Sequence, residues 1–320
     1  MSVIQQEGER PQICDYEGSD YRTRFWEAAD RAYEDAADRI ALARLLPPRG
    51  ERLIEIGAGF GRLADLYTGY QQVILLDYAT SQLRQAQERL GRDDRFLYVA
   101  ANLYHLPLAD SVLDTAITVR VLHHVQDLPA AFREIGRVLK PGGTYVLDYA
   151  NKRHLKAVLR YLLGRQRESP FSLAPYAFVP LNYDFHPAYV EARLREAGFA
   201  LQRQLAVSSF RLPLLKRLLG HRVLAALEGL LQGPTAPLKL APSIFIRATI
   251  AKADSSTEPA GLWRCPRCGG TEVAERKDGL ECFTCNTVWP LDDGIYDFKT
   301  SSQMSVARSS DDCLAETGDL

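Results

Sequence analysis

The sequence lacks a strong excess of charge of either sign, and it contains no long hydrophobic run. Its 39 Lys and Arg residues balance 40 Asp and Glu residues, for a formal net charge of -1 at pH 7. This balance excludes a chain that is basic throughout, as a general nucleic-acid-binding protein would be. No run reaches the ~18 consecutive apolar residues of a membrane-spanning helix, and the polar N-terminal segment has no apolar signal-peptide core. We therefore expect a cytoplasmic protein.

Cysteine is also scarce, with six residues in a chain of 320, too few for a scaffold held together by disulfides. Four of the six form two Cys-x-x-Cys pairs near the C-terminus, Cys265 with Cys268 and Cys282 with Cys285. In a reducing compartment such pairs indicate metal ligands. Four thiolates complete the tetrahedral coordination of zinc and leave no open position, so we predict a structural Zn²⁺ in a small ribbon. Such a module buries little core by itself, and the metal must contribute on the order of 10 kcal/mol of folding energy.

Apolar residues, by contrast, are abundant at 46% of the chain, enough for a sizeable core. Short, almost continuous apolar runs alternate with helical patterns, which is typical of a doubly wound α/β domain whose parallel, Rossmann-like sheet is covered on both faces. We expect seven strands, at residues 52–56, 72–77, 96–100, 113–119, 144–149, 199–207 and 243–251. We expect helices at residues 21–46, 60–67, 81–90, 128–139 and 187–197.

These patterns, together with changes in composition, predict how the chain is organised. The expected segments are a disordered tail at 1–20, the α/β domain at 21–252, a linker at 253–261, the zinc ribbon at 262–298 and a second disordered tail at 299–320. Two long inserts, at about 151–184 and 208–242, interrupt the second half of the α/β domain.

A glycine-rich loop follows the first expected strand and carries Gly57, Gly59 and Gly61. Glycines at alternate positions allow a sharp turn and a close approach of the backbone to a ligand. Asp77 ends the next strand, at the distance along the chain where an acid binds a ribose diol. A dinucleotide-binding loop has its third glycine three residues after the second, and the Glu55 carboxylate would repel a pyrophosphate. A cationic nucleoside such as S-adenosylmethionine fits this pattern better.

Several motifs in residues 50–150 resemble those of the class I SAM-dependent methyltransferases, in particular the type 11 methyltransferase domain. They are E-x-G-x-G-x-G at the loop, the acid that ends the second strand, NLYHLPLADSVLD, VLHHVQD and REIGRVLKPGGTYVLDY. The resemblance implies that the three glycines line the methionine end of S-adenosylmethionine and that Asp77 binds the ribose hydroxyls.

One position departs from the family pattern. Where the family usually has an acid that receives the adenine amino group, this chain has Asn102. An amide oxygen still accepts a hydrogen bond, though a weaker one than a carboxylate makes. The backbone N–H of the neighbouring Leu103 is expected to meet the adenine ring.

The sequence assigns no catalytic residue. Methyl transfer from a sulfonium is an in-line displacement, and positioning of the reactants alone contributes up to ~7–11 kcal/mol. Candidate bases follow the expected fourth and fifth strands, His124 in VLHH and Tyr149 in LDY. Each also suits a structural role, His124 as a packing or capping residue and Tyr149 as part of a pocket wall.

The two inserts are basic and leucine-rich, with no acid in residues 149–166 or 199–227. Three interpretations remain open: a lid over the sheet, a membrane-surface helix that admits a lipid- or quinone-like acceptor, or a basic mouth for RNA. A membrane-surface role would make the protein peripheral to the membrane.

The end of the cysteine module, TVWPLDDGIYDF, resembles the tail of the Trm112-like zinc-ribbon proteins that bind and activate methyltransferases. The resemblance implies that the ribbon docks on its own α/β domain or on a protein partner. The sequence therefore leaves two hypotheses for the function. One is a SAM-dependent methyltransferase acting on a lipid- or quinone-like small molecule, RNA or protein. The alternative is a catalytically degenerate, SAM-binding regulatory protein that acts through its ribbon.

Overall fold

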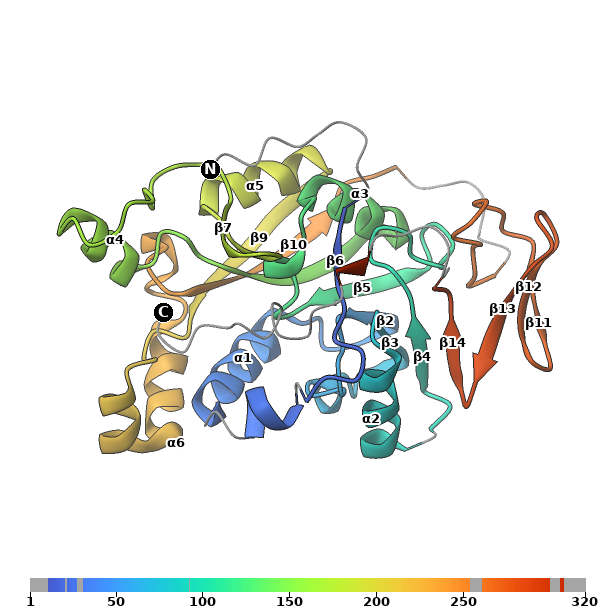
Figure 1. The fold of residues 1–320 in the computed structure, drawn as a ribbon, viewed down its shortest axis with the longest axis horizontal. Helices are drawn as coiled ribbons and strands as arrows, with labels where there is room; N and C mark the ends of the chain where they lie inside the picture. Colours follow the sequence, from blue (N-terminus) through green and yellow to red (C-terminus); the bar gives the residue numbers. More distant parts are fainter. Residues whose placement is uncertain are drawn as a thin grey trace.

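The computed structural model describes residues 11–20, 22–27, 31–91, 93–253, 261–299 and 306–307. Residues 1–10, most of the expected linker and most of the expected C-terminal tail lie outside the described residues. The chain folds around one twisted central sheet (Figure 1).

Seven strands of this sheet belong to the α/β domain, in the order β4-β3-β2-β5-β6-β10-β9. In chain order they are β2 (Gly50–Ile56), β3 (Tyr70–Asp77), β4 (Phe96–Ala100), β5 (Leu113–Thr118), β6 (Leu139–Ala150), β9 (Phe199–Val207) and β10 (Ser243–Ile250). The pairs from β4 to β6 are parallel, and β10 runs antiparallel to both of its neighbours. The predicted doubly wound, seven-stranded sheet is confirmed.

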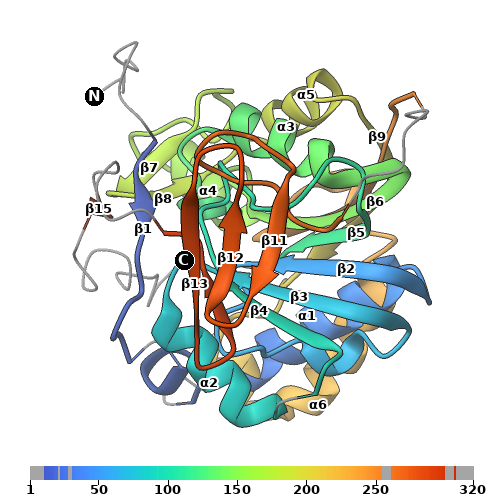
Figure 2. The same cartoon turned by 90° about the vertical axis from the view of Figure 1, so that its right-hand side faces the viewer.

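Helices cover both faces, as the apolar strand sequences require. On one face lie α1 (Ala32–Leu45), α2 (Thr80–Leu90) and α6 (Pro213–Leu231), which share a buried cluster with the side chains of that face (Figures 1 and 2). On the other face lie α3 (Leu128–Val138) and α5 (Pro187–Glu196), which pack into a second cluster. Every side chain from Val73 to Leu76 is at most 1% exposed, so this central strand is shielded from both sides.

The structure corrects two helix predictions. Residues 60–67, expected to be a helix after the glycine loop, form turns and a short 3-10 helix at Ala64–Leu66. The expected long helix at 21–46 is divided into a π-helix at Arg22–Glu27 and α1. Periodicity alone did not separate these cases, because the buried residues recur at helical spacing in both.

The two inserts form the end of the molecule that lies to the left in Figure 1. The first contains α4 (Leu155–Leu162), β7 (Tyr176–Val179) and β8 (Asn182–Asp184). The second contains α6 and a 3-10 helix at Ala236–Leu238. None of the described helices has the length and apolar character needed to cross a membrane.

The cysteine module lies at the opposite edge of the sheet (Figure 2). Its strands, β11 (Val273–Arg276), β12 (Gly279–Cys282), β13 (Thr287–Asp292) and β14 (Ile295–Asp297), form an antiparallel ribbon. The last of them pairs in parallel with β4, so the two sheets are continuous. Trp263 contacts Phe298 with ring centroids 5.4 Å apart, and both belong to the core of the α/β domain. The module thus covers an edge strand that would otherwise expose unpaired backbone groups.

The expectation of a disordered N-terminal tail is wrong for residues 11–20. Ile13–Cys14 forms β1, which pairs with β15 (Val306–Ala307) in the expected C-terminal tail. The Glu17 carboxylate accepts hydrogen bonds from the N–H groups of Thr80 and Ser81, at 2.6 and 3.1 Å. These N–H groups lie in the first turn of α2 and have no acceptor within the helix, so a carboxylate is favourable there.

Candidate functional site

A pocket lies at the carboxyl ends of β2, β3, β4 and β5, and we call it the strand-end pocket. Ligands bind at this edge in open α/β sheets. The wall includes five residues that the sequence predicts to bind the cofactor: Gly57, Gly59, Asp77, Asn102 and Leu103. Residues widely separated in sequence therefore meet around one cavity.

The glycine loop shapes the floor of this pocket. Gly57 and Gly59 have φ values of +72° and +52°, a conformation that other residues rarely adopt. A Cβ on Gly57 would lie 2.3 Å from Cγ2 of Val121, so Val121, in the turn after β5, could not pack against the loop. A Cβ on Gly59 would meet nothing within 4 Å and would project into open space. The loop therefore leaves room for a ligand against its backbone.

Four N–H groups of this loop, those of Gly57, Ala58, Gly59 and Gly61, are already used within the chain. Gly57 and Ala58 both donate to the carbonyl oxygen of Leu76, and Gly61 donates to that of Ala58. Gly59 donates to Oδ2 of Asp77 at 2.8 Å. A phosphate needs such donors and a helix N-terminus behind them, and within residues 57–67 the structure contains no α-helix. The loop therefore does not suit a dinucleotide.

Asp77 presents its carboxylate to the pocket from the end of β3. Its Oδ1 and Oδ2 accept hydrogen bonds from the N–H groups of Ala79 and Gly59, at 2.9 and 2.8 Å. Each oxygen has a second lone pair for a ligand hydroxyl. Burial raises the pKa of Asp77 to about 6, and these two N–H groups partly oppose the shift. The group is thus ionised near neutral pH and protonated in mild acid.

Asn102 and Leu103 line the opposite part of the pocket, after β4. Asn102 is 8% exposed, and its Oδ1 accepts a hydrogen bond from the Tyr104 N–H at 2.9 Å. This local bond holds the loop in its turn. The adenine contact of Asn102 and Leu103 stays a prediction.

Glu55 and Gly61 lie outside the lining of the strand-end pocket, so their expected contact with the cofactor stays a prediction. Side chains alternate along β2, so Glu55 points to the same face as Leu53 and is buried near Tyr67, while Ile56 reaches the pocket. Burial raises the pKa of Glu55 to about 8, and its Oε2 has no hydrogen-bond partner among the described residues. A Cβ on Gly61 would lie 3.0 Å from Cδ1 of Leu90, so this glycine permits close packing of α2.

The two candidate bases are separated by the structure. His124 lines the strand-end pocket, and its Nδ1 lies 2.8 Å from the carbonyl oxygen of Leu181. Because a carbonyl only accepts, Nδ1 carries the proton and Nε2 accepts from the Tyr16 hydroxyl at 2.8 Å. Tyr149 is 1% exposed, lies outside the pocket and packs in the core, so it is not a site residue.

Two parts of the site were missed by the sequence prediction. Gln12 to Tyr16 close one side of the pocket, and their polar sequence carries no signal of that position. Arg120 adopts a φ of +62°, donates its N–H to Oδ1 of Asp148 at 2.7 Å and binds Asp38 through its guanidinium. Its place in the wall depends on this strained backbone, which only the folded structure reveals.

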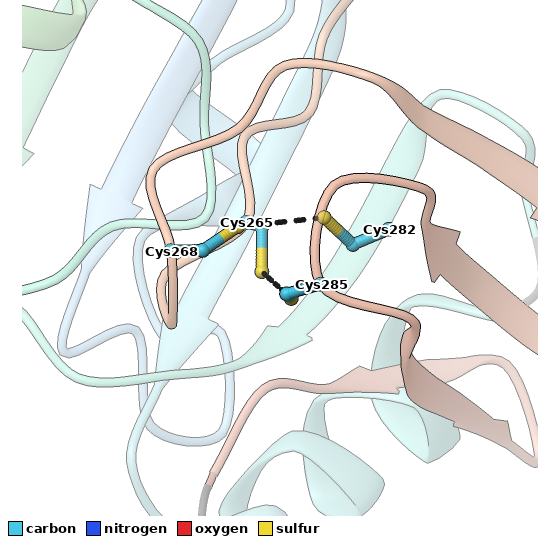
Figure 3. A group of neighbouring side chains, drawn as sticks. All are labelled: Cys265, Cys268, Cys282 and Cys285. Carbon is cyan, nitrogen blue, oxygen red and sulfur yellow. Dashed lines mark hydrogen bonds between the residues drawn. The ribbon is translucent and has the colours of Figure 1, made fainter.

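The four cysteines of the C-terminal module come together from two loops (Figure 3). All four Sγ atoms lie within 4.8 Å of one another. The Cys265–Cys285 and Cys268–Cys282 Sγ pairs are 3.7 and 3.6 Å apart. Tetrahedral zinc with bonds of ~2.3 Å separates its sulfur ligands by about 3.8 Å. The cluster therefore has the size of a four-thiolate metal site.

Comparison with known proteins finds a family match for one segment of the α/β domain. Residues 54–147 match the family model described as a methyltransferase domain. This segment is a methyltransferase domain. The matched residues run from β2 to β6 and include the glycine loop, Asp77 and Asn102.

Curated relatives of this methyltransferase domain act on different acceptors by name. The 27-O-demethylrifamycin SV methyltransferase of Amycolatopsis mediterranei is 31% identical over 41% of this chain and 51% of its own length. The malonyl-[acyl-carrier protein] O-methyltransferase of Geobacter sulfurreducens is 36% identical over 46% and 55%. A demethylmenaquinone methyltransferase of Roseiflexus is 34% identical over 47% and 64%. The chain spans about half the length of the curated relatives it matches.

Solved structures share the fold of the methyltransferase domain and its sheet. One is the complex between the Haloferax volcanii Trm112 methyltransferase activator and a methyltransferase. It has a TM-score of 0.51, 15% identity, and coverage of 72% of this chain and 96% of the matched chain. A SAM-dependent methyltransferase from Mesorhizobium loti has a TM-score of 0.50, 22% identity, and coverage of 68% and 99%.

Proposed function

We propose that the protein is a methyltransferase that uses S-adenosylmethionine bound in the strand-end pocket. The observation that carries this proposal is the hydrogen bonding of the glycine loop beside Asp77. Four N–H groups of this loop are satisfied internally, while the ionisable Asp77 carboxylate faces the cavity. Such a site suits a cationic nucleoside better than a pyrophosphate, which needs several free N–H donors.

Each lining group has a defined task in this proposal. When bound, S-adenosylmethionine supplies a methyl group on a positively charged sulfur. Asp77 accepts the ribose hydroxyls, Asn102 and Leu103 face the base, and Gly59 leaves space for the rest of the molecule. Tyr16, held by His124, closes the pocket against water. The chain thus acts mainly by positioning, which contributes up to ~7–11 kcal/mol.

Titration calorimetry with S-adenosylmethionine, followed by labelled-methyl transfer to a cell extract, tests this function. We expect binding and labelled product, and sorting the product into lipid, RNA, protein and small-molecule fractions identifies the acceptor class. Binding without any product would favour the alternative of a SAM-binding regulatory protein. Uptake of NAD(P)H instead of S-adenosylmethionine would refute the proposal.

Cofactor affinity is expected to rise with pH between pH 5 and 7. The pKa of Asp77 is about 6, so lowering the pH protonates the carboxylate and removes an ionic acceptor for the ribose hydroxyls. Below pH 6 the affinity should fall about tenfold per pH unit. Calorimetry at several pH values measures this, and Asp77→Asn should flatten the profile. An equally steep profile in the variant would assign the titration to another group.

We also propose that the four-cysteine cluster holds a structural Zn²⁺. The Sγ separations of 3.6 and 3.7 Å support it. The fused module would then stabilise the β4 edge in cis, in the manner of an activator bound to its enzyme. Cytoplasmic localisation and contact of the basic inserts with a membrane surface or RNA stay predictions.

Removal of this metal should unfold the cysteine module and leave cofactor binding in place. Metal analysis, thermal unfolding with and without chelator, and calorimetry with S-adenosylmethionine measure these effects. The melting temperature should also fall, because Trp263 and Phe298 of the module share the core of the α/β domain. Cys268→Ser should reproduce the change, whereas Ser substitution of the exposed Thr271 should not. A purified chain without bound zinc and insensitive to chelator would contradict this proposal.

A further inference from the structure

A second hollow lies directly beside the strand-end pocket, and the two share Arg120. We call it the polar pocket. Its wall comes from the ends of β6 and β10, the turn that carries His123, and the two inserts. Besides Arg120 and His123 it contains Asp148, Asp184 and Arg211. Because it adjoins the proposed cofactor site, it is where a methyl acceptor would meet the donor.

A third hollow, the apolar groove, extends the polar pocket outward. The two share His154, Arg211 and Pro242. The groove has a volume of about 520 Å³ and lies between α4 and the region where α6 begins. Leucines dominate its wall, namely Leu155, Leu159, Leu163, Leu212, Leu238 and Leu240. The three hollows therefore adjoin one another in a series that leads from the proposed cofactor site toward the insert end.

The charge along this path favours a negative group in the polar pocket. The Nε of Arg211 is inaccessible to solvent and has no hydrogen-bond partner among the described residues. Burial, with the positive charges of Arg120 and Arg31, lowers the pKa of Arg211 to about 10. Burial, with Arg211, Lys156 and Arg160, lowers the pKa of His154 to about 4. Arginines outnumber the two carboxylates that line the same wall.

The two carboxylates that line the polar pocket leave the Arg211 Nε without an acceptor. Asp148 accepts the Arg120 N–H at 2.7 Å, and Asp38 binds the Arg120 guanidinium from outside the pocket. Burial raises the pKa of Asp184 to about 6, although His123 and Arg211 oppose the shift. An ammonium group bound in this pocket would place a second positive charge beside the buried Arg211. An oxyanion, in contrast, would supply the acceptor that the Arg211 Nε lacks.

We propose that the methyl acceptor is an amphiphile whose ionised oxygen lies against Arg211 in the polar pocket and whose hydrocarbon chain fills the apolar groove. The inference rests on the proposed function and names its substrate class. The oxygen anion forms the new bond to the methyl carbon. The carbon–sulfur bond breaks, and its electron pair stays on sulfur, which becomes neutral. The product oxygen also becomes neutral, and its attraction to the arginines is lost, which favours release.

Binding of dodecanoate to the full-length protein loaded with S-adenosylhomocysteine tests this proposal. The probe carries an anionic oxygen and an apolar chain, and dodecylammonium and acetate serve as charge and chain controls. We expect dodecanoate to bind and both controls to bind at least tenfold more weakly. Arg211→Gln and Leu159→Glu should each weaken dodecanoate binding about tenfold, because one removes the cation and the other places a charge in the groove.

Leu162→Glu is the matched control for the groove. Leu162 lies on α4 one turn from Leu159, is 68% exposed and does not line the groove. Equal weakening by Leu159→Glu and Leu162→Glu would show adsorption to the surface and overturn the proposal. Equal binding of dodecylammonium, or no binding of dodecanoate, would also overturn it. If one of these outcomes occurs while the protein still binds S-adenosylhomocysteine normally, only the acceptor proposal fails and the proposed function stands. A wild-type chain that binds neither S-adenosylmethionine nor S-adenosylhomocysteine would instead refute the function.

Discussion

Asp77→Ala is expected to weaken S-adenosylmethionine binding by on the order of 100-fold, because in the proposed binding mode this carboxylate receives both ribose hydroxyls. A hydrogen bond to a charged group contributes ~1.5–3 kcal/mol, and two such bonds are lost. The N–H groups of Gly59 and Ala79 also lose their acceptor. Gly59 lines the pocket, where water can replace the carboxylate, whereas Ala79 is buried and its unpaired N–H costs ~1–3 kcal/mol. The fold should therefore persist, with a modest fall in melting temperature.

Calorimetry with S-adenosylmethionine and thermal unfolding of the same samples measure the two effects of Asp77→Ala separately. Asp65→Ala is the matched control, since Asp65 is a largely exposed acid outside the pocket. It should leave cofactor affinity unchanged. If Asp77→Ala binds S-adenosylmethionine as tightly as the unaltered protein, the ribose assignment is refuted.

Gly59→Leu is expected to abolish measurable cofactor binding. Gly59 lines the strand-end pocket, and a Cβ at this position would meet no atom of the chain within 4 Å. The leucine would occupy the space assigned to the cofactor. Its positive φ would also cost ~1–2 kcal/mol of folding free energy. The loss of cofactor affinity should thus be much larger than the loss of folding free energy can explain.

Gly142→Leu separates these two effects. Gly142 has a φ of +71°, its Cβ would also meet nothing within 4 Å, and it lies outside the strand-end pocket. The variant should show a similar fall in unfolding free energy, measured with denaturant, and normal cofactor affinity by calorimetry. Loss of affinity in both variants would mean that destabilisation, not occupation of the pocket, explains Gly59→Leu.

The local sequence predicted much of the α/β domain. Its seven strands are apolar runs covered on both faces, so their positions could be inferred without tertiary information. The largest shift is at β6, which begins at Leu139 where residue 144 was expected. Its register with β5 is irregular between Leu113 and Thr115, and the Pro-Gly-Gly segment of β6 is accommodated there. Such a bulge depends on the partner strand and has no local signal.

The sequence by itself determined the identity of the chemistry-bearing residues that are adjacent along the chain. The glycine loop, the acid that ends β3 and the paired cysteines follow from short motifs, because turns, strand ends and Cys-x-x-Cys knuckles are local structures. The cluster of four Sγ atoms within 4.8 Å agrees with that inference.

Only the tertiary structure decided which residues face the pocket and what closes it. Glu55 belongs to the same motif as the glycines, yet the alternation of side chains along β2 turns it into the core. Tyr16 reaches His124 across 108 residues, and β14 pairs with β4 from the far end of the chain. Contacts of this kind depend on packing between distant segments, and no short stretch of sequence specifies them.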